Sequence, residues 1–355
     1  MVSKNLVIFS DGTGNELKAK GNSNAMRLHG MTLETSQQIR FYDAGVGTQG
    51  SSQALTGVGR GVTRLLGLGF GYGLKSNVVE CYAFIMRRWE PGDSIYLFGF
   101  SRGAYTVRAL AGMLRVIGLL RPDQENMVPY ALKLFWKGHG KSIDWDHVNG
   151  FARQFAREDF ERWGHSVEFL GIWDTVKAVG WFTRRLQLPY TRLLKSVKTV
   201  RHACSLDEWR AQYKAYTISE TELGKQDRDM KEVWFAGVHS DVGGSYEPEH
   251  QLGDISMAWI GSEAIAAGLR VDEEDFAVYR TLPPSYASGT VHGLGKIWIP
   301  LGVSRRRVSP PGGRVHESVV VRMESSERER ARYQRKGVGP TNPVEPWPTG
   351  PELPT

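Results

Sequence analysis

The sequence has little cysteine and no long hydrophobic run. Its 355 residues include two cysteines, Cys81 and Cys204, without the C-x-x-C or histidine spacing of a zinc site, and they imply no disulfide framework. No segment has about 18 uncharged apolar residues, so we expect no membrane-spanning helix. The N-terminal apolar run is too short for a cleaved signal peptide. We therefore expect a chain that is cytoplasmic as made, with any export following a route that needs no cleaved signal.

Recognisable nucleic-acid-binding motifs are absent as well, although the chain is basic. Lysine and arginine total 45 against 38 acidic residues, which gives a net charge of +7. The charge accords with an ordinary basic surface, and the alternative is attraction to an anionic surface such as phospholipid head groups. We expect no nucleic-acid partner. A hydrophobic content of 41% allows a large core, as one elaborated α/β domain or two domains.

A strand pattern, a tight turn and a helix pattern follow one another in the middle of the chain. Ser94–Phe100 is an apolar run with the length of a strand buried on both faces. The G-x-S-x-G motif GFSRG at 99–103 overlaps its end, and Ala104–Leu114 has apolar residues at helical spacing. The two glycines avoid side chains that would crowd the neighbouring strand or helix. This arrangement predicts a nucleophile elbow in which Ser101 is the nucleophile.

A second Gly-rich loop is predicted to face this serine. The apolar run LVIFS leads into DGTGN at residues 11–15, which is too short for a P-loop. The carboxyl ends of strands are where α/β proteins place their sites. We therefore assign Gly12 and Thr13, together with Arg102 at the start of the helix, to oxyanion or substrate binding. Asp11 would orient the loop, and an ordinary Asx turn is the alternative.

Two further strand-like runs end in residues that would complete a catalytic triad. SVEFLGIW at 166–173 precedes Asp174, and EVWFAGV at 232–238 precedes His239. The chain order Ser, Asp, His is that of α/β-hydrolases. His239 would accept the proton of Ser101 as general base, and Asp174 would fix the imidazole tautomer and stabilise the imidazolium.

Each assignment has an alternative. His316, in the segment VHES, is the rival base, and Asp241 is the rival orienting carboxylate. Asp174 could instead be a turn residue and His239 a structural histidine. We prefer His239 because it ends an apolar strand and enters a Gly-rich turn. A metal-dependent hydrolase built on Asp11, Asp174 and His239 is a further alternative, and otherwise we expect neither cofactor nor metal.

The alternation of strand-like and helical runs predicts the fold class. We expect an α/β-hydrolase-like fold, with a mostly parallel sheet, helices on both faces and helical cap or insert segments. The catalytic domain would span 1–320, with the helical insert at about 121–164. A charged and then Pro-rich tail would follow at 321–355, extended from Gly337 onward.

Three other segments carry local predictions. Arg201–Tyr216 has the pattern of a helix with a Ser/Asp start. Trp181–Val200 is basic and apolar together, and we favour a solvated helical flank or loop over a stretch that rests on a membrane. The Gly-rich Gly50–Gly73 is either a lid or wall over the site or a closely packed helix.

Several motifs occur along the chain in one order: LVIFSDGTGN, FYDAGVGT, YLFGFSRGAYTVRALAGML, FLGIWDTV, RHACSLDEWR, WFAGVHSDVGG and LGDISMAWI. Together, over about residues 5–265 and with the VHES segment as a further match, they resemble the catalytic domain of the type VI secretion phospholipase effectors. The resemblance implies an α/β-hydrolase fold and phospholipase A activity on glycerophospholipids. It implies Ser101, Asp174 and His239 as the triad, with the DGTGN loop on the oxyanion side. Effector members are often much longer, with added membrane-docking regions, and little follows the core here.

The leading hypothesis is therefore a serine esterase or lipase of the phospholipase A type, which could be a secreted antibacterial effector. One alternative keeps the triad and takes a soluble ester, a thioester or a cell-wall acyl group. Another is a non-catalytic α/β-hydrolase fold used as a binding module. The partners implied are a phospholipid or other ester, a peripheral membrane contact, and a secretion-apparatus or immunity protein. Delivery to a target cell would use a signal-independent secretion system.

Overall fold

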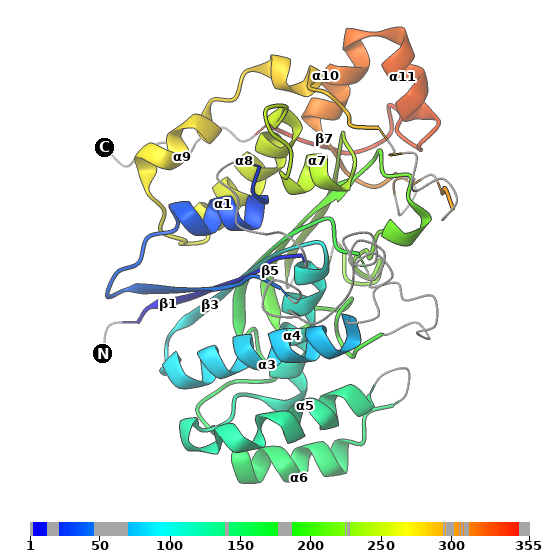
Figure 1. Cartoon of the computed structure of the whole chain (residues 1–355). Coiled ribbons are helices and arrows are strands. Elements are labelled where there is room, and N and C mark those ends of the chain that lie inside the picture. The colour runs from blue at the N-terminus through cyan, green and yellow to red at the C-terminus, as the bar shows by residue number, and fades with distance from the viewer. Residues whose placement is uncertain are drawn as a thin grey trace, which may run out of the picture.

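An eight-stranded sheet forms the centre of the molecule, and every pairing in it is parallel (Figure 1). This computed structural model describes residues 3–12, 21–45, 70–138, 142–176, 187–223, 225, 228–293, 295, 302–304, 306, 308 and 312–347. The strand order is β2-β1-β3-β4-β5-β6-β7-β8. The strands are β1 (Asn5–Ser10), β2 (Gln38–Asp43), β3 (Ser94–Phe100), β4 (Val167–Trp173), β5 (Val197–Ser205), β6 (Asp229–Phe235), β7 (Val315–His316) and β8 (Val344–Glu345).

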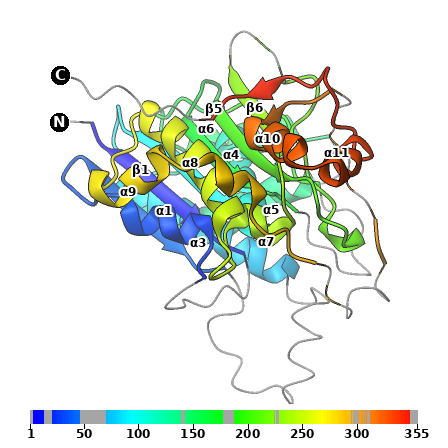
Figure 2. The same cartoon turned by 90° about the horizontal axis from the view of Figure 1, so that it is seen from above.

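Helices cover both faces of the sheet, as the sequence predicts for a doubly covered parallel sheet (Figure 1). One face carries α3 (Phe70–Arg88), α4 (Arg102–Ile117), α5 (Val128–Lys137) and α6 (Trp145–Phe155). The other carries α1 (Asn24–Met31), α8 (Gln251–Ala266) and α9 (Glu273–Arg280), and Figure 2 shows the molecule from this side. Shorter elements are α7 (His239–Gly243), α10 (Glu317–Ser325), α11 (Glu327–Gln334), and the 3-10 turns η1 (Pro122–Met127), η2 (Ala211–Tyr213) and η3 (Pro284–Ser288).

Alternation along the strands divides the apolar side chains between two cores. In β1, Leu6 and Ile8 belong to the core under α3 and α4, while Val7 and Phe9 belong to the core under α1 and α8. All four are fully buried. Successive side chains of a strand point to opposite faces, so a strand with helices on both sides has to be apolar throughout. This is why the uninterrupted apolar runs in the sequence correctly predict the central strands.

The prediction of a helix over Arg201–Tyr216 is wrong. Residues up to Ser205 belong to β5, which pairs with β4 and β6 on its two sides, and the only helical turn in the described part of that range is η2. Arg201 belongs to the strand because its guanidinium reaches acidic partners, Asp229 and, at 2.7 Å, Glu263. Pairing with two neighbouring strands outweighs the local helical pattern.

The C-terminal segment predicted as a tail at 321–355 packs into the fold over the residues that the structure describes. The segment 317–347 forms α10, α11 and β8, and β8 extends the sheet by pairing with β7. Tyr333 is fully buried, and Lys336 is buried against Asp207. The charged composition of this segment misled the prediction because its charges have partners in the main body, which a linear pattern does not reveal. Residues 348–355 lie outside the described residues.

Two further predictions fall partly outside the described residues, which exclude residues 50–69 of Gly50–Gly73 and residues 181–186 of Trp181–Val200. The described part of Trp181–Val200, from residue 187, consists mainly of turns that lead into β5. No helix among the described residues is long and apolar enough to cross a bilayer.

Candidate active site

Ser101 lies in the tight turn between β3 and α4, in a strained backbone conformation. Its φ is 60° and its ψ is −118°, a region that residues other than glycine rarely adopt. The turn leaves no room for side chains on its flanks. A Cβ atom on Gly99 would lie 2.7 Å from the backbone of Gly103, and one on Gly103 would lie 2.0 Å from the carbonyl oxygen of Ser10. Both glycines are therefore required here, as the sequence predicts.

His239 links Ser101 to Asp174. Its Nε2 atom lies 2.8 Å from Ser101 Oγ, and its Nδ1 atom lies 2.6 Å from Asp174 Oδ2. His239 is the first residue of α7, directly after the loop that follows β6. The ring stacks on Phe100 with centroids 4.7 Å apart and meets Tyr213 edge-on at 4.8 Å. The structure thus brings together the three residues that the sequence places at strand ends.

The Asp174 carboxylate is fully buried and has several donors around it. Oδ1 accepts a hydrogen bond from Ser205 N at 2.9 Å and from Arg306 Nη1 at 2.5 Å, while Oδ2 accepts from Ser205 Oγ at 3.1 Å. Burial alone would raise the pKa of Asp174, but the charge of Arg306 and the hydrogen bond from His239 hold that pKa well below its ordinary value. Asp174 is therefore an anion at neutral pH.

The protonation state of His239 follows from its surroundings. Burial lowers the pKa of the imidazole, and the hydrogen bond and charge of Asp174 oppose this shift without cancelling it. The ring is then neutral at neutral pH, with Nδ1–H donating to Asp174. Nε2 is left to accept the hydroxyl proton of Ser101. The arrangement can take a proton from Ser101 Oγ and stabilise the imidazolium that forms.

The start of the loop after β1 lies against the first turn of α4, where a Cβ on Gly103 would be 2.8 Å from the backbone of Asp11. Arg102 begins α4, whose first backbone N–H groups have no partner within the helix. Gly12 N donates to the side chain of its neighbour Asp11, with 2.7 Å between N and Oδ1. Asp11 Oδ2 accepts from Tyr42 OH at 2.9 Å and from Ser23 Oγ, so Asp11 ties the loop to α1 and β2. Thr13 lies outside the described residues.

The rival residues have other partners. His316 is buried with its Nδ1 2.9 Å from Ser318 Oγ, its ring stacks on Phe235, and burial lowers its pKa to about 3. Asp241 Oδ1 lies 2.5 Å from His292 Nδ1, and Oδ2 accepts from Val238 N at 2.8 Å. Neither residue takes the place of His239 or Asp174 beside Ser101.

One group of the described residues has the spacing of metal ligands, and it differs from the group considered from sequence. His202, Cys204 and Glu232 are buried, with candidate ligand atoms within 4.8 Å of one another. However, His202 Nδ1 lies 2.9 Å from Glu232 Oε2, and its Nε2 accepts from Thr175 N at 3.2 Å. The Arg108 guanidinium lies 3.2 Å from Nδ1. His202 and Glu232 thus already bond to each other and to neighbouring backbone N–H groups beside the Arg108 cation, which disfavours an added metal ion here.

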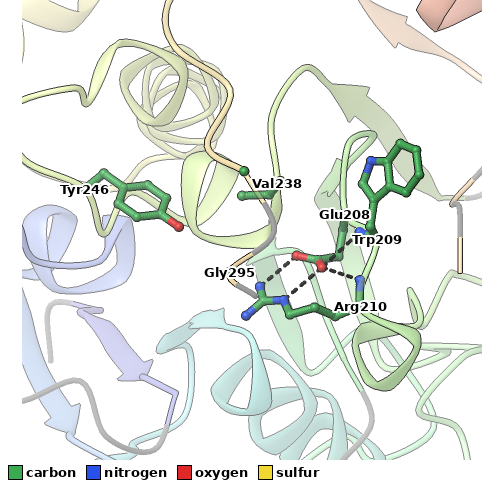
Figure 3. A pocket seen from close by; sticks show the side chains of 7 residues that line it. Glu208, Trp209, Arg210, Val238, Tyr246 and Gly295 are labelled. Carbon is green, nitrogen blue, oxygen red and sulfur yellow. Dashed lines mark hydrogen bonds and ion pairs between the residues drawn. The ribbon is translucent and has the colours of Figure 1, made fainter. Parts of the chain in front are cut away.

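Val238, the residue before His239, lines a pocket of about 280 Å3, which therefore lies beside the His239 backbone (Figure 3). Glu208 lies in its wall and accepts the backbone N–H of His239 at 3.2 Å. Arg210 pairs with Glu208, with Nη2 2.7 Å from Oε2. Figure 3 shows the Tyr246 hydroxyl and the Arg210 guanidinium facing the same space. The remaining lining residues are Trp209, Val238, Gly293 and Gly295. The pocket therefore has a polar wall with an arginine near the candidate base.

Sequence reasoning missed Arg306 and Ser205, both of which bind the Asp174 carboxylate. Arg306 is the middle of the three consecutive arginines at 305–307, and no linear pattern marks it out. Ser205 fell inside the stretch wrongly predicted as a helix. Recognising β5 as a strand beside β4 would have placed Ser205 next to Asp174 at the carboxyl edge.

The parallel sheet, the strained serine turn and the Ser–His–Asp contacts define a protein of the α/β-hydrolase class. Residues 4–263 match the family described as "T6SS, Phospholipase effector Tle1-like, catalytic domain". The chain belongs to this family.

One relative and two similar solved structures are longer than this chain. "Uncharacterized protein YEL023C" of Saccharomyces cerevisiae is 33% identical over 220 residues, which cover 59% of this chain and 32% of the yeast protein. The structure titled "Structure of the Tle1 effector bound to the VgrG spike from the Type 6 secretion system" is 21% identical with a TM-score of 0.39, covering 70% of this chain and 52% of that one. An uncharacterized protein from Pseudomonas aeruginosa is 19% identical with a TM-score of 0.44, covering 96% and 52%. The chain thus spans about a third of the yeast relative and about half of each structure.

Proposed function

We propose that this protein is a serine hydrolase of carboxylic esters, of the phospholipase A type, with Ser101, His239 and Asp174 as its catalytic triad. The observation that carries the proposal is the continuous chain of contacts from Ser101 Oγ through the His239 ring to Asp174, with distances of 2.8 Å and 2.6 Å. The order of these groups and the neutral state of His239 are what nucleophilic catalysis by serine needs.

In the first half-reaction, Ser101 Oγ attacks the ester carbonyl carbon as His239 Nε2 takes its proton. The carbonyl oxygen becomes an oxyanion, which the first turn of α4 would stabilise through the backbone N–H of Arg102. A second donor is expected from the loop of Gly12 and Thr13, at Thr13 because the Gly12 N–H already donates to Asp11. The imidazolium then protonates the departing alcohol oxygen, and an acyl group remains on Ser101.

In the second half-reaction, water attacks the acyl carbonyl carbon. His239 takes a proton from this water, and the resulting imidazolium returns a proton to Ser101 Oγ as the carboxylic acid leaves. Asp174 stays ionised throughout and stabilises the imidazolium in both steps. The low pKa of Asp174 supports this role, because a protonated Asp174 could not provide the charge.

A glycerophospholipid is the substrate class that we propose. Family membership supports it, since the family is described as phospholipase effectors. The pocket beside His239 adds a local argument, because Arg210 and Tyr246 could hydrogen-bond the phosphate of a head group. The released products would then be a fatty acid and a lysophospholipid.

We also propose that a secretion apparatus delivers this protein. The related Tle1 effector was solved bound to the VgrG spike of the type VI secretion system. By family membership, we extend this kind of partner to the present chain, together with a cognate immunity protein that would protect the producing cell.

The test is hydrolysis of phospholipid vesicles by the purified chain, with fatty acid and lysophospholipid measured by mass spectrometry. Ser101→Ala is the control variant. Release of both products by the parent chain alone is the expected result. Turnover of short soluble esters with vesicles left intact would instead favour a soluble ester substrate. No turnover of either substrate by folded protein would overturn the enzyme proposal and favour a binding module.

A further inference from the structure

A second and larger cavity lies apart from the pocket beside His239, between α3 and α5. Its volume is about 620 Å3, more than twice the 280 Å3 of that pocket. The two helices that form it pack against each other on the outer side of α4 (Figure 1). Apolar side chains make up much of its lining: Val79, Pro129, Leu132 and Trp136. Trp136 is half-buried and Pro129 is exposed, so this groove presents apolar surface to the outside.

Three lysines surround this apolar surface. Lys75, Lys133 and Lys137 line the groove, and all three are exposed. Lys75 Nζ lies 5.0 Å from the centre of the Trp136 ring, which places a positive charge over the aromatic face. Within the part of the chain that the structure describes, no carboxylate forms an ion pair with any of the three lysines. The groove is therefore apolar in its lining and positive at its rim.

The groove opens at the same edge of the sheet as Ser101. The first turns of α3 lie beside the end of β2, where the Asn77 side chain hydrogen-bonds Asp43. Asp43 Oδ2 accepts from Ser10 Oγ at 2.8 Å, at the end of β1. Ser10 in turn lies against Gly103 in the turn that carries the nucleophile. These contacts connect the start of α3 to the elbow along the carboxyl edge of the sheet.

We propose that the groove between α3 and α5 is a docking site for the anionic surface of a phospholipid bilayer. The lysine ammonium groups would contact lipid phosphates, while Trp136 and its apolar neighbours would enter the boundary between head groups and acyl chains. Lysine and tryptophan are suited to this boundary because each combines an apolar body with a polar end. The inference rests on the proposed function, since docking here would hold the carboxyl edge and Ser101 close to a lipid substrate.

Charge complementarity favours this occupant. Each lysine near an anionic bilayer adds electrostatic attraction, so three lysines on one rim form a substantial electrostatic anchor. The net charge of +7 adds a favourable long-range field. An anionic bilayer supplies both the phosphates and the apolar layer that the two parts of the groove require.

The test is co-sedimentation of the full chain, as the Ser101→Ala variant, with vesicles of phosphatidylcholine alone or mixed with phosphatidylglycerol. Binding is expected to the anionic vesicles and to weaken as salt is raised. Combined Lys75→Glu, Lys133→Glu and Lys137→Glu substitutions are expected to reduce this binding at least about tenfold. Trp136→Ala, with the lysines intact, is expected to weaken it as well.

A matched control makes an equal change in charge at three positions outside the groove. Arg153, Lys195 and Arg330 are exposed and lie outside the groove, and their combined replacement by Glu is expected to leave most of the binding. Equal loss in this control, or equal binding to neutral vesicles, would overturn the proposal.

Neutral Lys→Gln versions of the three groove substitutions replace the Glu variant if that variant does not fold. Soluble-ester turnover, measured with Ser101 restored, should be the same with and without the groove substitutions. If the parent chain turned over neither the soluble ester nor phospholipid, that result would contradict the proposed function, and the vesicle-binding comparison would still decide the docking proposal.

Discussion

The guanidinium of Arg306 lies against the carboxylate of Asp174, with 2.5 Å between Nη1 and Oδ1 and both side chains buried. Arg306 also donates to Ser205 Oγ at 2.6 Å and to the carbonyl oxygen of Tyr213. It lies beyond residues 4–263, the part of the chain that matches the family. The C-terminal part of the fold thus contributes a residue that sets the charge of the candidate site. A buried carboxylate needs such a partner to stay ionised.

Replacing Arg306 by Met is expected to weaken both the fold and the site. Removing one partner of a buried ion pair costs about 3–5 kcal/mol, measured as the free energy of unfolding in urea. The remaining buried Asp174 would have a higher pKa, so we expect lower kcat/KM for a soluble ester. Arg330→Met, at an exposed position, is the control and should change neither value. A fully active and stable Arg306→Met protein would show that this ion pair does not support the site.

Gly103→Ala tests the packing of the serine turn. The new Cβ would lie 2.0 Å from the carbonyl oxygen of Ser10, so backbone must shift, and we expect a loss of about 3 kcal/mol or more in the free energy of unfolding. Gly150→Ala, inside α6 with no atom within 4 Å of the added Cβ, should raise stability by about 0.5–1 kcal/mol. Thermal or urea unfolding of both variants measures the difference. Similar behaviour of the two variants would contradict the close packing described for the turn.

Paired histidine substitutions distinguish the two candidate bases. His239→Gln removes the ring beside Ser101 Oγ, and we expect kcat to fall about 1,000-fold or more. His316→Gln alters a buried ring stacked on Phe235, so it should reduce stability while leaving kcat of the folded protein within about threefold. Kinetics on a soluble ester, normalised to folded protein, gives both values. The reverse pattern would make His316 the base.

The pH dependence of kcat/KM should report the titration of His239. The imidazole acts as a base only when neutral, and burial sets its pKa below the ordinary 6.5. As pH falls through this lowered pKa, His239 gains a proton and activity is lost. We therefore expect activity to fall on the acid side with a midpoint lower than 6.5. A midpoint clearly above 6.5 would mean that the charged form is favoured in the free enzyme.

Local patterns predicted the serine turn and the strands around it, because each of these features is specified by neighbouring residues. β3, the turn with Gly99 and Gly103, and the start of α4 depend on apolar runs and on a steric need for glycine. The positions of Asp174 and His239 followed from the rule that parallel strands end at one edge. Their juxtaposition with Ser101 is geometric, and their catalytic roles rest on the proposal above.

Contacts between residues far apart in the chain determined the features that local patterns did not predict, such as the strand at Arg201 and the packing of the C-terminal segment. Arg201 lies in a strand because Asp229 and Glu263 neutralise it from elsewhere in the fold. Asp207 holds the C-terminal segment through Lys336 and Tyr333, more than a hundred residues away. Such pairs connect distant segments without any linear signature.

Covalent labelling with a fluorophosphonate probe tests the central claim most directly. The account predicts one adduct per folded chain, located on Ser101 by peptide mass spectrometry and absent from Ser101→Ala. Labelling should be strongly slowed in His239→Gln, since that variant lacks the base beside Ser101 Oγ. An adduct on another residue, or no adduct on the folded parent chain, would contradict the assignment of Ser101 as a nucleophile activated by His239.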